Sequence, residues 1–251
     1  MRVELVRHAT LLVDYAGLRL LVDPLLAEPA SLPPMSPAAD ERPNPLVALP
    51  RPVDQLLAGV DAVLVTHTHS DHWDPSAQAA LPTATPVLAQ PNDLQTIAGQ
   101  GFTRVQGVEE DHALGDARIT RVDARHGHGQ MAQDMAPSSG YVLRAPGEPT
   151  LLLTGDTVFY EGLAATLAQH QPGVVVVNTG AAEFSEGGPI TMTADDVVLT
   201  ARAGPGALLV AVHLEAINHC GLTRAALGRR LSSEGLAQRV HVPADGDVIT
   251  A

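Results

Sequence analysis

The stretch VTHTHSDHWD occupies residues 65–74 and follows directly on a short apolar run. His67 and His69 are two residues apart, so in an extended segment their side chains project to the same side. Asp71 and His72 come next, where the chain must turn. Three imidazoles and one carboxylate within six residues form a dense set of nitrogen and oxygen donors. Such a set predicts a site for Zn²⁺, Mn²⁺ or Fe²⁺.

The apolar run in front of this stretch, Ala62–Val65, is typical of a β-strand buried on both faces. The alternative interpretation is a solvated polar loop that happens to be rich in histidine. We disfavour this interpretation because a solvated loop need not begin at the end of a buried strand.

Ionisable residues recur at the ends of three later apolar runs. The predicted strand Ala117–Val122 leads to His126 and His128, and a further group follows each of two others: Asp156 after Thr150–Leu153, and His213 after Ala207–Val212. Any one of these alone would more often be a polar residue at a strand edge. Their repetition predicts that distant parts of the chain converge at one sheet edge to hold two metal ions.

The order of these motifs resembles the metallo-β-lactamase superfamily over most of the chain. HxHxDH begins at His67, and a strand-end histidine, the TGD of Thr154–Asp156 and a late histidine follow it. His8 in a first strand and LLVDP at Leu20–Pro24 resemble the branch that contains L-ascorbate-6-phosphate lactonase-like hydrolases. The resemblance implies an α/β fold, a four-layer αββα sandwich with the metals at one edge between two sheets.

The resemblance also implies a ligand set for two divalent ions, Zn²⁺ first, with Mn²⁺ or Fe²⁺ as alternatives. The first ion would be held by His67, His69 and a third histidine. The second would be held by Asp71, His72 and His213, with Asp156 bridging both. His126 lies nearest its strand end and is preferred as the third histidine, and His128 is the alternative.

A pair of such ions would share a hydroxide, because coordination lowers the pKa of water towards 7. The predicted reaction is hydrolysis of a small ester, lactone or phosphodiester. Asp71 is expected to orient the nucleophile, and His219 and His128 are candidates for protonating the leaving group. Asp23 is a plausible acceptor for the second ring nitrogen of a metal-bound histidine.

Two other functions compete with this one. The TGDT at Thr154–Thr157 also occurs in glyoxalase II-like thioesterases, so a thioester is an alternative substrate. A metal-binding protein without catalysis is the other alternative. Antibiotic hydrolysis is disfavoured, since the commonest β-lactamases place a cysteine in the second metal site and Cys220 falls in no matching motif.

Composition narrows the classes further. The 251 residues carry a net charge of −13, which opposes binding to nucleic acid or an anionic membrane. All 15 basic residues are arginine, which excludes lysine-dependent mechanisms. The single cysteine cannot form an internal disulfide.

We expect a small-molecule substrate. We also expect a cytoplasmic protein, because neither a signal-peptide core nor a membrane-spanning run is visible. Whether copies form a homo-oligomer stays open.

Hydrophobic patterning predicts a single domain over residues 1–251, with a Pro-rich loop at about 24–52 that is either a lid or a disordered insertion. Helices are expected at Asp93–Gly99, Glu161–Gln169, Ala194–Ala203 and Thr223–Glu234. Further strands are expected at Arg2–Val6, Leu11–Tyr15, Arg19–Val22, Val87–Leu88, Thr103–Val105, Tyr141–Leu143, Gly173–Val177, Arg239–Val242 and Val248–Ile249.

Overall fold

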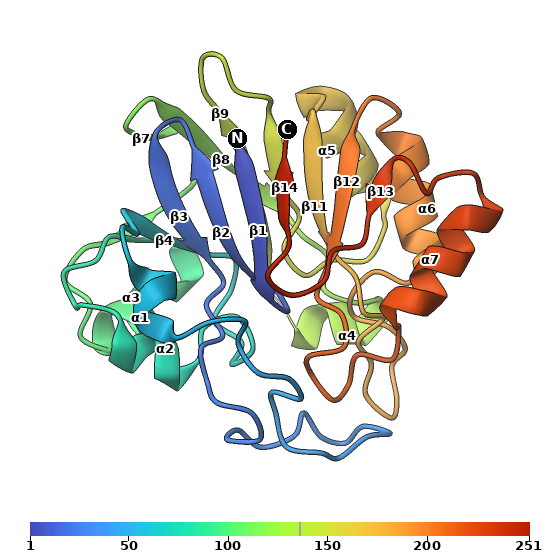
Figure 1. Cartoon of the computed structure of the whole chain (residues 1–251), viewed down its shortest axis with the longest axis horizontal. Coiled ribbons are helices and arrows are strands. Elements are labelled where there is room, and N and C mark those ends of the chain that lie inside the picture. The colour runs from blue at the N-terminus through green and yellow to red at the C-terminus, as the bar shows by residue number, and fades with distance from the viewer. Residues whose placement is uncertain (136) are drawn as a thin grey trace.

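The computed structural model describes residues 1–135 and 137–251 and contains two seven-stranded β-sheets (Figure 1). The first sheet has the spatial order β14 (Val248–Thr250), β1 (Arg2–Arg7), β2 (Thr10–Tyr15), β3 (Leu18–Val22), β4 (Ala62–Val65), β5 (Val87–Ala89) and β6 (Val105–Gly107). The second has the order β13 (Val240–His241), β12 (Leu208–Val212), β11 (Val174–Asn178), β10 (Leu151–Leu153), β9 (Ser139–Arg144), β8 (Ala117–Asp123) and β7 (His112–Leu114).

Each sheet combines antiparallel and parallel strands. Strands β1, β2 and β3 form an antiparallel meander, whereas β3 to β6 run parallel. In the second sheet β7 to β10 are antiparallel and β10 to β13 are parallel. The central parallel strands are almost wholly apolar, as in AVLV of β4 and VVVVN of β11, because both of their faces are covered.

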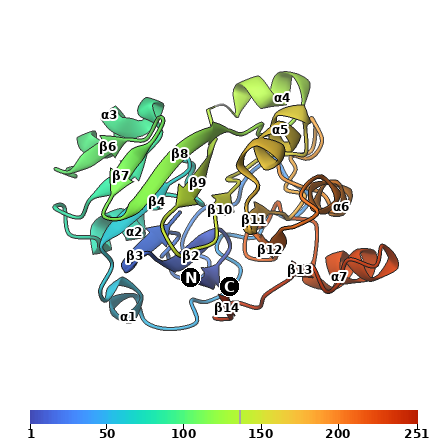
Figure 2. The same ribbon diagram turned by 90° about the horizontal axis from the view of Figure 1, so that it is seen from above.

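Helices cover the outer face of each sheet, as Figure 2 shows from above. Beside the first sheet lie α1 (Val53–Leu57), α2 (Pro75–Ala80), the 3₁₀ helix η1 (Pro91–Asp93) and α3 (Leu94–Gly99). Beside the second lie α5 (Glu161–His170), α6 (Ala194–Ala203) and α7 (Arg224–Ser233). A short helix, α4 (Gly129–Asp134), lies below the strand ends (Figure 1).

Three apolar clusters separate these four layers. One lies between the sheets and joins residues such as Leu11 and Leu64 to Leu143 and Val210. A second packs α5, α6 and α7 on the second sheet, and a third packs α1, α2 and α3 on the first. The predicted αββα sandwich is therefore confirmed. Among the described residues, none of the helices has the length and apolarity to cross a bilayer.

The Pro-rich segment 24–52 is packed against the lower edge of the sandwich (Figure 1). Arg7, which is fully buried, donates to the carbonyl oxygens of Leu25, Ala27 and Val47 at 2.8 to 2.9 Å. Asn218 accepts a hydrogen bond from the Met35 backbone at 2.8 Å. These contacts pack the segment as a wall beside the strand ends.

Candidate metal centre

The HxHxDH stretch turns sharply after β4 and leads into α2. The backbone N–H groups of His72 and Trp73 both donate to the carbonyl oxygen of His69, at 3.0 and 2.9 Å. Asp74 then caps α2, because its side chain accepts from the Ala77 N–H at 2.7 Å. The indole of Trp73 is buried in the apolar cluster under the first sheet. This turn, fixed at both ends, directs the three histidines of the stretch towards one point.

The first group of donors consists of His67, His69 and His126. Nε2 of His67 lies 2.9 Å from Nδ1 of His69. The ring centroid of His126 lies 5.4 Å from that of His67 and 5.3 Å from that of His69. One donor atom from each ring falls within 4.8 Å of the others. Of the two histidines considered as third donor, the structure thus brings His126 to the group.

The second group consists of Asp71, His72 and His213, and a ring nitrogen of His8 lies within 4.8 Å of their donor atoms. Nε2 of His72 and Nε2 of His213 lie 3.3 Å apart, and Oδ2 of Asp71 lies 3.8 and 3.7 Å from them. His213 follows β12 at once and has a left-handed φ of 68°. Strained backbone of this kind persists only where the surrounding structure holds it, and it clusters at functional sites.

Asp156 lies between the two groups. Its Oδ2 is 3.5 Å from Nε2 of His126 and 3.3 Å from that of His72, and its Oδ1 is 3.4 Å from that of His213. Gly155 precedes it with φ of 60°, and a Cβ at Gly155 would collide with the Ser139 carbonyl oxygen. The TGD turn therefore needs glycine to bring the carboxylate to this position.

The ring nitrogens that face away from the centre have partners of their own. Nδ1 of His72 lies 2.9 Å from Oδ2 of Asp23, as the sequence suggested. Nδ1 of His126 donates to the Ile190 carbonyl oxygen at 2.8 Å. Nδ1 of His213 is 3.6 Å from the Cys220 sulfur. Such outer contacts fix the orientation of histidines that bind metals.

Electrostatics at the centre favours a cation. Burial alone would raise the pKa of Asp71 and Asp156, but the surrounding imidazoles hold both well below the usual carboxyl value. Burial lowers the pKa of His67 and His126, which keeps their rings neutral. Burial also opposes charge on His213, yet Asp156 outweighs it and raises that pKa to about 10. Ionised carboxylates and imidazole nitrogens are the donors that Zn²⁺, Mn²⁺ and Fe²⁺ accept, so the residues fit such ions.

His128 and His219, the two candidates for protonating the leaving group, lie in different surroundings. His128 is exposed and lies at the start of α4, and among the described residues its side chain makes no capping hydrogen bond. His219 is buried, and its Nδ1 has no partner in that part of the chain. Burial lowers the pKa of His219 to about 4, although the negative charges of Asp71 and Asp156 act in the opposite direction. His219 is thus the candidate beside the centre.

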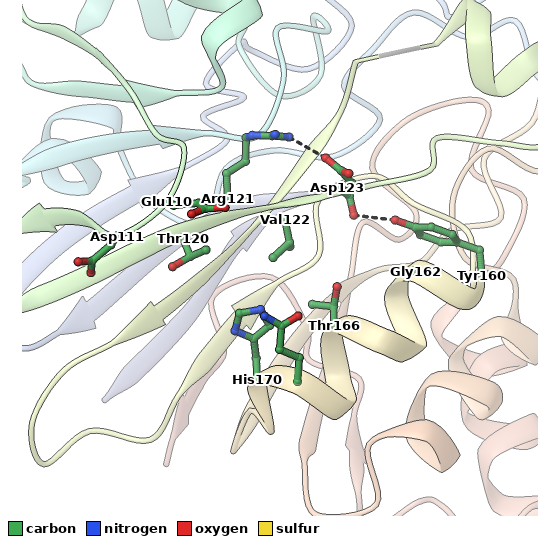
Figure 3. Close-up of a pocket in the computed structure, with 11 residues that line it drawn as sticks. Glu110, Asp111, Thr120, Arg121, Val122, Asp123, Tyr160, Gly162, Thr166 and His170 are labelled. Atoms are coloured by element: carbon green, nitrogen blue, oxygen red, sulfur yellow. Dashed lines mark hydrogen bonds and ion pairs between the residues drawn. The ribbon is translucent and has the colours of Figure 1, made fainter.

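A cavity of about 530 Å³ adjoins His219 and Cys220. Its other walls are the Pro-rich segment, at Asp40, and the loop that contains Phe184. The rings of Phe184 and His219 have centroids 5.5 Å apart. A larger cavity of about 660 Å³ lies between β8 and α5, where Tyr160 donates to the Asp123 carbonyl oxygen (Figure 3). Neither cavity is lined by a residue of the two donor groups, but the smaller one reaches the centre through Cys220, whose sulfur lies 3.6 Å from Nδ1 of His213.

Sequence comparison identifies the family. The model of the β-lactamase superfamily domain matches residues 19–214. The chain belongs to the metallo-β-lactamase superfamily. UPF0173 protein YddR of Bacillus subtilis (strain 168) is 34% identical over 255 residues, which covers 100% of each chain. Membership of this superfamily agrees with the αββα sandwich and with the order of the histidine and aspartate motifs.

Two solved structures of the superfamily are similar over the full length. An isothiocyanate hydrolase from Delia radicum gut bacteria is 37% identical with a TM-score of 0.96, covering 100% of this chain and 99% of that one. A possible metal-dependent hydrolase from Veillonella parvula DSM 2008 is 30% identical with a TM-score of 0.96 and the same coverage. The chain is therefore a metal-dependent hydrolase of the metallo-β-lactamase superfamily.

Proposed function

We propose that the chain is a binuclear hydrolase. His67, His69 and His126 would hold one divalent ion, Asp71, His72 and His213 the other, and Asp156 would bridge them. The observation that carries this proposal is the position of the Asp156 carboxylate, within 3.5 Å of ring nitrogens from both groups. Two bound ions would supply a water-derived nucleophile at neutral pH and draw charge from the substrate. Zn²⁺ suits the nitrogen-rich donor set best.

The protein's own side chains divide the remaining tasks. Asp71 would orient the attacking water, since its carboxylate faces the second group of donors. His219 would carry a proton to the leaving group. Burial lowers its pKa to about 4, so the neutral ring would first take the proton that the attacking water releases, and its Nδ1 is buried without a partner among the described residues next to the centre. His128 is the weaker candidate for this step, as its ring is exposed.

For the substrate we propose a small organic isothiocyanate, on the basis of the full-length similarity to an isothiocyanate hydrolase. Water would add across the C=N bond of R–N=C=S: its oxygen bonds to the central carbon and one of its protons goes to nitrogen, which gives the thiocarbamic acid R–NH–C(=S)–OH. The C–N bond would then break as the hydroxyl proton moves to nitrogen, and R–NH₂ and carbonyl sulfide leave. Carrying these protons to nitrogen is the role proposed for His219.

The residues that line the cavity beside His219 favour a substrate with an uncharged organic group. Its walls contain Asp40 and Glu183 but neither lysine nor arginine. A phosphate is usually bound by guanidinium groups, so a phosphodiester fits this cavity poorly. Phe184 offers an aromatic surface to the organic group R. Esters, lactones and glyoxalase II-like thioesters also present an electrophilic carbon to the attacking water. They remain alternative substrates in this proposal. The lactonase branch stays a prediction.

The experiment is a substrate panel with the purified full-length protein. Benzyl isothiocyanate, a γ-lactone, a p-nitrophenyl ester, a thioester and bis-p-nitrophenyl phosphate are offered with Zn²⁺, with Mn²⁺ and with a chelator. We expect metal-dependent loss of the isothiocyanate, abolished in Asp156→Asn and unchanged in His241→Asn, which alters an exposed histidine of β13. Turnover of another substrate alone would overturn the isothiocyanate assignment. A metal-loaded protein inert towards the whole panel would favour the non-catalytic alternative.

A further inference from the structure

His8 occupies the tight turn between β1 and β2, at the edge of the first sheet. It is fully buried and has a left-handed φ of 60°. Left-handed backbone is uncommon for residues other than glycine, although histidine is enriched there. A buried polar ring on strained backbone calls for a compensating interaction.

The ring of His8 contacts two residues of the second donor group. Its Nε2 lies 3.1 Å from Oδ2 of Asp71, the carboxylate oxygen that faces His72 and His213. Its ring centroid lies 3.6 Å from that of His213, with the ring planes inclined by 40°. The His8 carbonyl oxygen also accepts the backbone N–H of His213 at 2.9 Å. His8 thus links the turn of the first sheet to a donor that the second sheet supplies.

The proton on His8 can be assigned from its partners. An ionised carboxylate only accepts, so Nε2 must carry the proton that Asp71 receives. Nδ1 of His8 has no partner among the described residues, which suits a bare lone pair better than a buried N–H. If Nε2 bound a metal ion directly, the proton would lie on Nδ1 and remain unpaired. The geometry therefore favours a hydrogen bond to Asp71 over a bond to the ion.

We propose that His8 is a positioning residue for the second metal ion. It donates to Asp71 through Nε2 and holds His213 through ring contact and the backbone hydrogen bond. This inference rests on the proposed binuclear site. Its consequence is asymmetry between the sites. Among the described residues His8 contacts Asp71 and His213, and it makes no hydrogen bond or ring contact with His67, His69 or His126.

Two variants separate this role from a merely structural one. His8→Asn retains a residue that tolerates left-handed backbone but shortens the side chain, so its amide does not reach Asp71. His8→Gln places an amide N–H near the position of Nε2 and can donate to the same oxygen. His241→Asn serves as the control. Zn²⁺ stoichiometry and stepwise affinity are measured with a competing chelator, the Co²⁺ absorption spectrum is recorded, and the melting temperature of the metal-free protein reports on folding.

In His8→Asn we expect the affinity for one of the two ions to fall about 10–100-fold while the other is retained. His8→Gln should recover most of that loss, and the Co²⁺ spectrum should change only for the weakened site. Wild-type affinity at both sites in His8→Asn, an equal loss at both, or no recovery in His8→Gln would overturn the proposal. A wild-type protein that binds a single ion would instead contradict the binuclear site on which it rests.

Discussion

Oδ2 of Asp23 lies 2.9 Å from Nδ1 of His72, and this contact joins the end of β3 to the second donor group. The same carboxylate accepts the backbone N–H and the hydroxyl of Thr66, both at 2.7 Å. One buried side chain therefore fixes the start of the HxHxDH stretch and orients its last histidine. Asp23 itself has a left-handed φ of 43°.

Replacing Asp23 with asparagine should weaken metal binding. The variant keeps the size of the side chain but removes the negative charge that orients His72, and changes of this kind cost about 10–100-fold in metal affinity or activity. Isothermal titration of the metal-free protein with Zn²⁺ measures the effect. Wild-type affinity in Asp23→Asn would show that the carboxylate only supports the backbone of Thr66.

His219→Gln should lower kcat about 100-fold for a substrate whose leaving group needs a proton, since general acid catalysis contributes about 10²–10⁴-fold. The loss should shrink to a few-fold with a p-nitrophenyl ester, whose leaving group departs as an anion. His128→Gln, at an exposed position, is the matched comparison. A large loss in His128→Gln and none in His219→Gln would reverse the two assignments.

Removing metal should lower the melting temperature by at least about 10 °C. An ion present at about 1,000 times its Kd stabilises the native state by about 4 kcal/mol per site, and a chain of this size gains about 2–4 °C per kcal/mol. Without ions, the buried carboxylates and imidazoles of the centre face only one another. Scanning calorimetry with and without a chelator tests this, and identical melting curves would argue against occupied sites.

All three tyrosines should titrate at unusually high pH. Burial raises the pKa of Tyr15 to about 12, and it also raises the pKa of Tyr141 and Tyr160. Between about pH 10 and 12 the unfolded chain loses the Tyr15 proton while the folded chain keeps it, so the unfolded state binds fewer protons and stability falls as pH rises. Phenolate absorbance measures the titration. Three phenols ionising near pH 10 in the intact fold would contradict the burial.

Tyr15→Phe is the control for this alkaline effect. The Tyr15 hydroxyl donates to the carbonyl oxygens of Leu143 and Pro149, both at 3.0 Å, and so joins the two sheets. The variant should lose about 1–3 kcal/mol of stability, because those buried acceptors lose their donor. It should also show a smaller decline between pH 10 and 12 than the wild type.

The sequence predicted the elements whose patterns are local. The strand Ala62–Val65 and the helix Ala194–Ala203 match the structure at both ends, and Thr223 caps α7 as expected. The strand expected at Thr103–Val105 lies two residues further along the chain, since β6 begins at Val105, where it pairs with β5. The short helices α1, α2 and α4 were not predicted, whereas α3, which is no longer, lies within the helix expected at Asp93–Gly99.

The same distinction between local and long-range features applies to the metal centre. The spacing of His67, His69 and His72 is visible in the sequence, and so is each strand-end residue that joins them. The place of His8 beside Asp71 is not, because it depends on how the first hairpin meets β12 across the two sheets. The sequence favoured His126 over His128 because His126 lies nearer its strand end, and the structure brings His126 to the first group, with a turn at Gly127, whose φ is 107°, between the two histidines.

The burial of Cys220 has a chemical consequence if the proposed isothiocyanate is the substrate. Amines and thiols attack the central carbon of isothiocyanates, yet this chain has no lysine and a single cysteine. Burial raises the pKa of that thiol, which keeps it protonated and poorly nucleophilic. The one α-amino group is paired with Glu148 at 2.9 Å. The molecule thus exposes few groups that such a reagent could covalently damage during turnover.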